Sequence, residues 1–526
     1  MSKQITQRIE ALINEGKFEE GRALAQQSGL NPVDMEAVLG AIAFKEGKYQ
    51  EAEVTFQRVL QANPNHVATK SNYTSLLVKQ RKFKLALPFA KEAFDKNPTH
   101  EGFAVNYAAC LSETDRFEEA VNVLQPLADK PDSSERVVLA CAATLRGAVR
   151  PEEALALLRL AQTRFPDSTE IVRALADAEA EMDPRLAAMA LRRLEKKLPD
   201  SVSLKWNASF SELRIRNFRR GWQLYEHGLD EKIGKIGRPL PAQVKVFPRL
   251  TELDEIDPNK WTLFTCEQGL GDQILFLGAL REALQRFPKS ALVAEERMVG
   301  LLQRSFPETP VYTYALAHGW ANQKHRINGV FPIGSLMRHF RGSVASFGRH
   351  RRSYLKPDAS LVDKYRAALQ AKAPGDEIIG ISWRGGYWDR QKRTKSFEFE
   401  LFAQLMKAPG RRFVALQYGD VAAERAESKR LGLPVTFVDG IDFIKNTDAW
   451  FALAMACDRI ISVSTALVHF VGAAGGRVDL LIGDYQAPFI WGLDEGRSLP
   501  YANVHIHRKS REESVQEFFH RVEATL

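Results

Sequence analysis

Small residues recur at a fixed interval through the N-terminal part of the chain. Five alanines stand 34 positions apart, and a second series of small residues keeps the same interval upstream of them. The first series is Ala52, Ala86, Ala120, Ala154 and Ala188, and the second is Gly40, Thr74, Ala108, Ala142 and Ala176. Two such registers predict pairs of antiparallel helices that cross closely at the small residues and stack into a solenoid.

Prolines and aromatic residues keep step with this period. Aromatic residues precede three of the alanines by three positions, and a proline follows each predicted second helix, which it cannot continue. The aromatic residues are Tyr49, Phe83 and Phe117, and the prolines are Pro64, Pro98, Pro131, Pro166 and Pro199. A period of 34 residues with this pattern is typical of tetratricopeptide repeats (TPR).

A TPR solenoid commonly binds proteins or extended peptides on its concave face. Asn72 and Asn106 hold the same repeat position on successive first helices. We therefore predict that their amides contact a protein acceptor. The alternative reading is that both are solvated helix residues without a binding role.

The second half of the chain alternates short apolar runs with helical patterns. The predicted strands of the first set cover residues 261–266, 290–295, 311–315 and 328–333, and those of the second set cover 377–383, 412–417, 435–439, 459–464 and 478–483. Alternation of this kind predicts two parallel sheets covered by helices, with ligands at the carboxyl ends of the strands. The fold class is α + α/β. The predicted domains are a TPR domain over 1–230, a proline-containing linker over 231–260, and two Rossmann-like halves over 261–357 and 358–526.

The first candidate site is the sequence EQGLGD, which leads from a strand into a helix. Gly269 and Gly271 are predicted to allow a tight turn and a close approach to a ligand, and the helix N-terminus can bind an anion. Asp272 is positioned to accept a proton from an attacking hydroxyl. The alternative is that Asp272 caps the helix and the glycines only make the turn.

Two further candidate sites follow strands of the second set. Arg384, Arg393 and Lys395 lie in a basic loop that could clamp a phosphate, although a solvated loop has the same composition. Ser464 and Thr465 precede a helix whose N-terminal N–H groups could hold a diphosphate. His469, one turn into that helix, is expected to be a packed residue.

Composition narrows the function classes. The net charge of +8 is too small for this length to indicate nucleic-acid binding, and the four cysteines form no C-x-x-C pair. The N-terminus lacks the apolar core of a signal peptide, so we expect a cytoplasmic protein without a membrane span. No D-x-D pair, P-loop or H-E-x-x-H is found, which favours a mechanism without a metal or other cofactor.

Several ordered motifs resemble bacterial TPR-fused glycosyltransferases. They are EQGLGDQILF, GSLMRHF followed by YLKPD, GISWRGG followed by RTKSF, FVALQYGD, and RIISVSTALVHFVGAAGG. The C-terminal half is similar to lipopolysaccharide heptosyltransferases, and the architecture is distantly similar to the eukaryotic O-GlcNAc transferase. This resemblance implies a GT-B fold and a nucleotide-sugar donor.

The resemblance also implies roles for individual residues. Asp272 would be the general base, Arg384 and Lys395 would neutralise the leaving phosphate, and flagellin would be one possible class of acceptor for the TPR domain. The family's D-T-G/A element reads Ser464, Thr465 and Ala466 here, so its aspartate is missing. Two functions therefore stand side by side: an inverting O-glycosyltransferase acting on Ser or Thr of a protein, and a TPR adaptor or chaperone with an inactive transferase domain.

Overall fold

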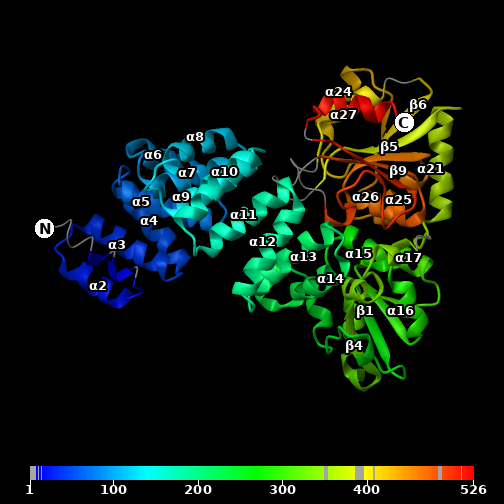
Figure 1. Ribbon diagram of the computed structural model, residues 1–526, viewed down its shortest axis with the longest axis horizontal. Helices are drawn as coiled ribbons and strands as arrows, with labels where there is room; N and C mark the ends of the chain where they lie inside the picture. The colour runs from blue at the N-terminus through cyan, green and yellow to red at the C-terminus, as the bar shows by residue number, and fades with distance from the viewer. Residues whose placement is uncertain are drawn as a thin grey trace. The chain divides into compact units, whose positions relative to one another are not determined.

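The computed structural model describes residues 8–9, 11–13, 15–348, 353–385, 396–406, 409–483, 488–510 and 512–526. Contacts divide the chain into two units, residues 1–182 and 183–526. The chain is a helical TPR solenoid followed by an α/β region with parallel sheets, which confirms the predicted fold class (Figure 1).

The first unit consists of helices that pack against their sequence neighbours. They are α2 (Phe18–Gln27), α3 (Pro32–Lys45), α4 (Tyr49–Ala62), α5 (Val67–Lys79), α6 (Phe83–Lys96), α7 (Glu101–Ser112), α8 (Phe117–Ala128), α9 (Glu135–Gly147), α10 (Pro151–Arg164) and α11 (Thr169–Met182). The repeated alanines within them are fully buried, as Ala52, Ala86 and Ala120 illustrate. Each repeat proline within this unit lies just beyond a second helix, as predicted.

The last helices of the repeat pattern are grouped with the second unit. They are α12 (Pro184–Lys197), α13 (Val202–Arg214) and α14 (Phe218–Tyr225). Trp206, Trp222 and Tyr225 from these helices share a hydrophobic core with residues of the α/β region. The Trp222 indole Nε1 also donates to the carbonyl of Arg341, at 3.0 Å.

The segment expected to be a linker is folded onto the first sheet. It follows η1 (Glu226–Leu229) and contains the short helices η2 (Glu231–Ile236), η3 (Ala242–Val244) and η4 (Leu253–Glu255). Arg238, Val244 and Phe247 are buried, and Arg249 forms a parallel bridge with Val330. Its prolines therefore shape a packed connection, not an extended tether.

The first sheet has the order β3-β2-β1-β4 and is parallel throughout. Its strands are β1 (Trp261–Thr265), β2 (Ser290–Ala294), β3 (Val311–Thr313) and β4 (Ile327–Pro332). The helices of this half are α15 (Leu270–Leu277), α16 (Leu280–Arg286), α17 (Glu296–Ser305), α18 (Tyr314–His318), η5 (Gly319–Arg326), η6 (Ile333–Ser335), α19 (Leu336–Phe340) and α20 (Val344–Gly348). All four predicted strands are present.

The second sheet has the order β10-β11-β9-β8-β5-β6-β7, in which only β10 is antiparallel. Its strands are β5 (Glu377–Ser382), β6 (Arg411–Ala415), β7 (Val435–Phe437), β8 (Arg459–Val463), β9 (Val478–Ile482), β10 (Gly496–Arg497) and β11 (Val504–Arg508). The helices are α21 (Ala359–Lys372), α23 (Phe399–Leu405), α24 (Ala422–Arg430), α25 (Thr447–Met455), α26 (Ala466–Ala474), η7 (Phe489–Trp491) and α27 (Val515–Glu523). Strands β5 to β9 were predicted from the sequence, whereas β10 and β11 were not.

The candidate loops of the second sheet lie where successive strands begin to be added on the other side of β5. In the second sheet β5 lies between β6 and β8, so the loops that follow β5 and β8 leave from adjacent strands. Ser382 is paired with Ser462 at this position. Ligands of doubly wound sheets bind at such a switch point, beyond the carboxyl ends of the strands.

Candidate functional site

The EQGLGD turn connects β1 to α15. Gln268 has φ +68°, whereas Gly269 is the N-cap of α15 with φ −71°. The sharp part of the turn is therefore made by Gln268, and the prediction that the glycines provide it was wrong. Backbone strain at a non-glycine residue persists only where neighbouring contacts hold it. Here Gln273 Nε2 donates to the Gln268 carbonyl, at 2.9 Å.

A buried ion-pair network holds Glu267, the first residue of the EQGLGD turn. Arg238 donates to Glu267 Oε1 at 2.8 Å and to Glu226 Oε1 at 2.9 Å, and Ser335 Oγ bonds Glu226 Oε2 at 2.9 Å. Glu267 Oε1 also accepts the Gly334 N–H, which follows β4. Burial alone would lower the pKa of Arg238, but the two carboxylates outweigh it and raise that pKa.

Gly271 is required for close helix packing. A Cβ at this position would lie 3.0 Å from His469 Cδ2 and 3.7 Å from Ala466 Cα. Gly271 is in the first turn of α15, and Ala466 is the first residue of α26. The N-termini of these two helices therefore meet, and the predicted close approach of the backbone is to α26.

Two buried tyrosines lie near Asp272. Tyr225, at the end of α14, donates its hydroxyl to Gln268 Oε1, and Tyr501 precedes β11. The pKa of each phenol is raised, mainly by burial and further by the Asp272 carboxylate. Asp272 is half-buried in the first turn of α15, and a Cβ at the N-cap residue Gly269 would lie 3.4 Å from its Oδ2. Its role as a base and the capping alternative both stay predictions.

His469 is packed within this junction. Its Nδ1 lies 2.9 Å from the Tyr501 hydroxyl, and its ring lies 4.9 Å from the ring of Trp491. Burial lowers the pKa of His469 to about 3, so the imidazole is neutral near pH 7. Its contacts agree with the expected packing role.

Ser464 and Thr465 stand at the beginning of α26. Trp491 Nε1 donates to Ser464 Oγ at 2.9 Å, and Thr465 Oγ1 lies 3.4 Å from Ser462 Oγ. Thr465 is the N-cap residue, but its hydroxyl makes no capping bond within the described chain. The first N–H groups of α26 are oriented toward the junction with α15, where an anion would be stabilised.

Arg384 leaves β5 and is directed toward the neighbouring β6–α24 loop. Its guanidinium pairs with Glu424 at 3.0 Å and donates to the Asp420 carbonyl at 2.6 Å. Gln417 holds this loop, since its Oε1 accepts the N–H of Arg384 at 2.8 Å. Arg384 would have to exchange Glu424 for a phosphate in order to act as predicted. Arg393 and Lys395 lie outside the described residues.

The two repeat asparagines lie on α5 and α7. Asn106 is buried, and its Nδ2 donates to Ser75 Oγ in the preceding repeat at 2.9 Å. Asn72 is half-buried on α5. The amide of Asn106 therefore already links two repeats, which distinguishes it from a solvated helix residue.

Among the described residues, no group of three or more His, Cys, Asp or Glu is arranged to hold a metal ion. Within the same residues, no helix combines the length and apolar character needed to cross a bilayer. The four cysteines are buried free thiols, and burial raises the pKa of Cys110 and Cys457 to about 12.

The residues that support the site could not be predicted from the sequence. Arg238, Tyr225 and Tyr501 are distant from the EQGLGD motif in sequence, and none belongs to a recognised pattern. One feature of the sequence indicates such a partner. Glu267 follows an apolar strand directly, and a carboxylate buried there needs a cation or hydrogen-bond donors. That signal does not identify the partner.

Comparisons with known proteins agree with the helical part of the fold. A family model described as tetratricopeptide repeat matches residues 77–143. Protein FlbA of Caulobacter vibrioides is 26% identical over 330 residues, which cover 60% of this chain and 52% of that protein. The chain thus spans about half the length of this curated relative.

Solved structures of TPR proteins are similar to part of the chain. A tetratricopeptide repeat protein from Parabacteroides merdae is 16% identical, with 43% of this chain and 90% of that chain covered and a TM-score of 0.35. A thermophilic TPR protein from Thermus thermophilus is 19% identical, with 34% and 99% covered and a TM-score of 0.30.

Proposed function

We propose that the protein is a metal-independent glycosyltransferase that moves a sugar from a nucleotide-activated donor to a Ser or Thr of a protein acceptor. The observation that carries this proposal is the meeting of the α15 and α26 N-termini, with Asp272 in the first turn of α15. The motif resemblance to TPR-fused glycosyltransferases adds support. The four unpaired thiols suit a reducing compartment, so we place the reaction in the cytoplasm.

The junction of the two helices supports a diphosphate site. Each helix N-terminus carries about half a positive charge, and two adjacent positive ends repel unless an anion lies between them. Ser464 and Thr465 contribute hydroxyls on the α26 side, and Gly269 and Gly271 keep the α15 side free of larger side chains. The leaving diphosphate of a nucleotide sugar has the charge that this arrangement favours.

Asp272 acts in this proposal as the general base. The acceptor oxygen forms a bond to the anomeric carbon, and its proton passes to the Asp272 carboxylate. The bond between the anomeric carbon and the phosphate oxygen breaks, and the nucleoside diphosphate leaves with the electron pair. A single base and direct displacement lead to inversion at the anomeric carbon.

The TPR solenoid supplies the acceptor. Solenoids of this kind present extended surfaces to protein partners, and flagellin is the acceptor that the family resemblance suggests. Asn72, which is half-buried on α5, remains a predicted acceptor contact. Asn106 would contribute only if its bond to Ser75 were exchanged for one to the acceptor.

The decisive test is the Asp272→Asn variant, assayed by intact mass of a co-expressed acceptor and by release of nucleoside diphosphate. A positioned base contributes roughly 10²–10⁴-fold, so transfer should fall by that factor while the fold is retained. Asp363→Asn, an exposed carboxylate on α21, is the matched control and should transfer at the wild-type rate. Wild-type turnover by Asp272→Asn would remove this residue from the mechanism.

The competing function is a TPR adaptor whose transferase half is inactive. Two observations favour it: Ser464 replaces the aspartate of the related family and is bonded to Trp491, and Arg384 is paired with Glu424. Thermal unfolding with UDP, GDP, ADP, CMP and dTDP compounds separates the two functions. A ligand at 100 times its Kd adds about 2.7 kcal/mol, so the absence of any shift would favour the adaptor.

A further inference from the structure

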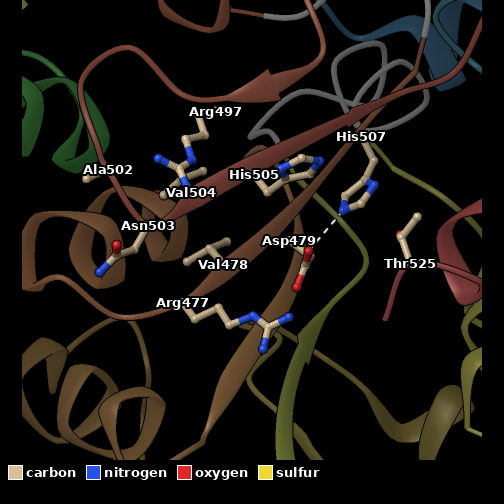
Figure 2. Close-up of a pocket in the computed structure, with 10 residues that line it drawn as sticks. All are labelled: Arg477, Val478, Asp479, Arg497, Ala502, Asn503, Val504, His505, His507 and Thr525. Atoms are coloured by element: carbon tan, nitrogen blue, oxygen red, sulfur yellow. Dashed lines mark hydrogen bonds and ion pairs between the residues drawn. The ribbon is translucent and has the colours of Figure 1, made fainter. Parts of the chain in front are cut away.

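A pocket of about 480 Å³ lies where β9 and β11 begin, at the end of these strands opposite to the proposed diphosphate site (Figure 2). Its walls come from the first residues of β9 and β11, which are Val478 and Val504, and from β10. The diphosphate site lies beyond the carboxyl ends of the strands, whereas this pocket lies at their amino ends. The two are therefore separate sites on one sheet, and we call this one the β9–β11 pocket.

Strand pairing assembles a row of polar side chains in the β9–β11 pocket. Asp479 on β9 is paired with His505 on β11, and His505 is paired with Arg497 on β10. His507 is two positions further along β11, so its side chain points to the same face as that of His505. The rings of His505 and His507 lie 4.7 Å apart.

Asp479 is buried with one carboxylate oxygen incompletely satisfied. Its Oδ1 bonds His507 Nε2 at 2.9 Å, as Figure 2 shows, whereas its Oδ2 receives no hydrogen bond from the described residues. Arg459 Nε faces Oδ2 at 3.5 Å as an ion pair, beyond good hydrogen-bond distance. Both atoms of this ion pair are buried, so the group of the polar row that a ligand can reach is the exposed His505 ring.

The rim of the pocket carries two arginines that are free to bind an anion. Arg477 precedes β9 and Arg497 is on β10, and both side chains are exposed. In the part of the chain that the structure describes, neither guanidinium has a hydrogen-bond or ion-pair partner. Arginine binds phosphate oxygens through pairs of charge-assisted hydrogen bonds, so this rim favours a phosphate group.

We propose that the β9–β11 pocket binds a small phosphorylated compound with free hydroxyl groups, a sugar monophosphate in chemical class. Arg477 and Arg497 bind its phosphate, and a hydroxyl forms a hydrogen bond with the His505 ring, which His507 and Asp479 support from within the sheet. The volume is within the range of small-molecule sites and matches a ligand of this size. This inference stands apart from the proposed transferase function, because it uses none of the residues of the α15–α26 junction.

Calorimetric titration of the full chain with a panel of hexose monophosphates tests the proposal. We expect one site that binds at least one member of the panel about tenfold more tightly than inorganic phosphate, because the hydroxyl contact adds roughly one hydrogen bond. The double variant Arg477→Gln/Arg497→Gln should weaken that binding at least about thirtyfold. Arg281→Gln, an exposed arginine on α16, is the matched control and should bind as the wild type does.

Three results of the titration would overturn all or part of this proposal. Absence of binding by the whole panel at millimolar concentrations would overturn the site, and so would unchanged binding by the double variant, since the ligand would then occupy another position. Equal affinity for hexose monophosphates and inorganic phosphate would overturn the contact with His505. Both substituted arginines are exposed, so the variant should unfold at the wild-type temperature.

Discussion

The two units satisfy their buried polar groups over very different distances along the chain. In the solenoid, buried threonine hydroxyls donate to carbonyls four residues earlier in the same helix, as in Thr55 to Glu51, Thr74 to Lys70 and Thr144 to Ala140. Its charged groups pair at most with the next repeat, as Arg146 on α9 does with Glu181 on α11 at 2.6 Å, a separation of 35 positions. Local partners of this kind are available wherever a repeat is folded.

The α/β unit connects segments that are far apart in sequence. Arg238 bonds Ser335 across 97 positions, and the Trp222 indole donates to the Arg341 carbonyl across 119 positions. The Tyr354 hydroxyl donates to the Ile274 carbonyl across 80 positions. These partners meet only after both sheets and the helices around them have formed, so disruption of one contact affects a larger region.

The difference indicates where function resides. Repeats that satisfy themselves locally can vary their surfaces without loss of fold, which suits a binding solenoid. Buried charged and titratable groups held by distant partners are costly to assemble and are concentrated at functional sites.

All eight tryptophans lie beyond residue 182, so tryptophan fluorescence reports the α/β unit and helical circular dichroism is needed for the solenoid.

The largest expected effect is the loss of stability of the α/β unit at low pH, which His469 causes. Its pKa falls from 6.5 to about 3 on folding, so protonation of the unfolded state destabilises the α/β unit as the pH decreases from 6.5 toward 3. The full effect is roughly 5 kcal/mol. His469→Asn should remove this dependence, so its stability relative to wild type should rise on acidification in urea titrations followed by fluorescence.

His520→Asn is the control for this experiment, because His520 is exposed on α27. That variant measures what the His→Asn substitution does to unfolding at an exposed position. A stability difference between His469→Asn and the wild type that does not change with pH would show that His469 is not buried in its neutral form.

The second prediction compares a buried ion pair with an exposed one. Arg238→Met leaves Glu226 and Glu267 facing each other without a cation, which should lower the free energy of unfolding of the α/β unit by about 3–5 kcal/mol. Arg116→Met removes an exposed pair with Glu119 in the solenoid and should change the free energy of unfolding far less, because water screens this pair. Denaturant midpoints from fluorescence and circular dichroism measure the two effects.

Adding Glu267→Gln to Arg238→Met should restore part of the lost stability, because it removes the charge that the first substitution leaves unpaired. Equal small losses for Arg238→Met and Arg116→Met would contradict the contrast between the units.

The third prediction tests close packing in the solenoid. A Cβ at Gly147 would lie 2.1 Å from Phe117 Cε1, so Gly147→Ala should destabilise the solenoid by about 1–3 kcal/mol. Gly300→Ala on α17 is the matched substitution, since the nearest atoms to its Cβ are 3.7 Å away. It should stabilise the α/β unit by up to about 1 kcal/mol through helix propensity. Thermal unfolding that shows the same sign for both would disprove the packing argument.

The smallest effect concerns the turns within repeats. Gly47, Arg81, Asp115 and Val149 are spaced by the repeat period and all have positive φ, with Val149 at +62°. This conformation is strained for a β-branched residue, so Val149→Gly should stabilise the solenoid by about 1 kcal/mol. Gly47→Val should have the opposite effect. Helical circular dichroism during thermal unfolding measures both, and a loss of stability in Val149→Gly would show that the turn is not strained.

The solenoid could be predicted closely from the sequence. The buried faces of Ala52, Ala86 and Ala120 follow from spacing alone, because each repeat contacts its neighbours and the same local geometry recurs. The main strands of both sheets were also predicted, since parallel strands read as continuous apolar runs. Strand β10 was missed because its two residues form no pattern, and β11 because alternating histidines interrupt its apolar run.

The candidate site could be predicted only in part. The position of Asp272 in the first turn of a helix after a strand follows from the EQGLGD motif. The partners of that turn could not be predicted, since Arg238 lies in a segment that reads as a linker and Tyr225 ends a helix of the repeat pattern. The ion pair between Arg384 and Glu424 could not be predicted either, because it depends on the pairing of β5 with β6.

By itself the sequence determined the periodic helices, the apolar strands and the order of the loops that follow them, because these depend on neighbours within a few tens of residues. The tertiary structure alone decided that the N-termini of α15 and α26 meet at Gly271, and that Asp479, His505 and Arg497 form one polar row. Such convergence depends on strand order and register, which bring together residues whose separation along the chain carries no signal.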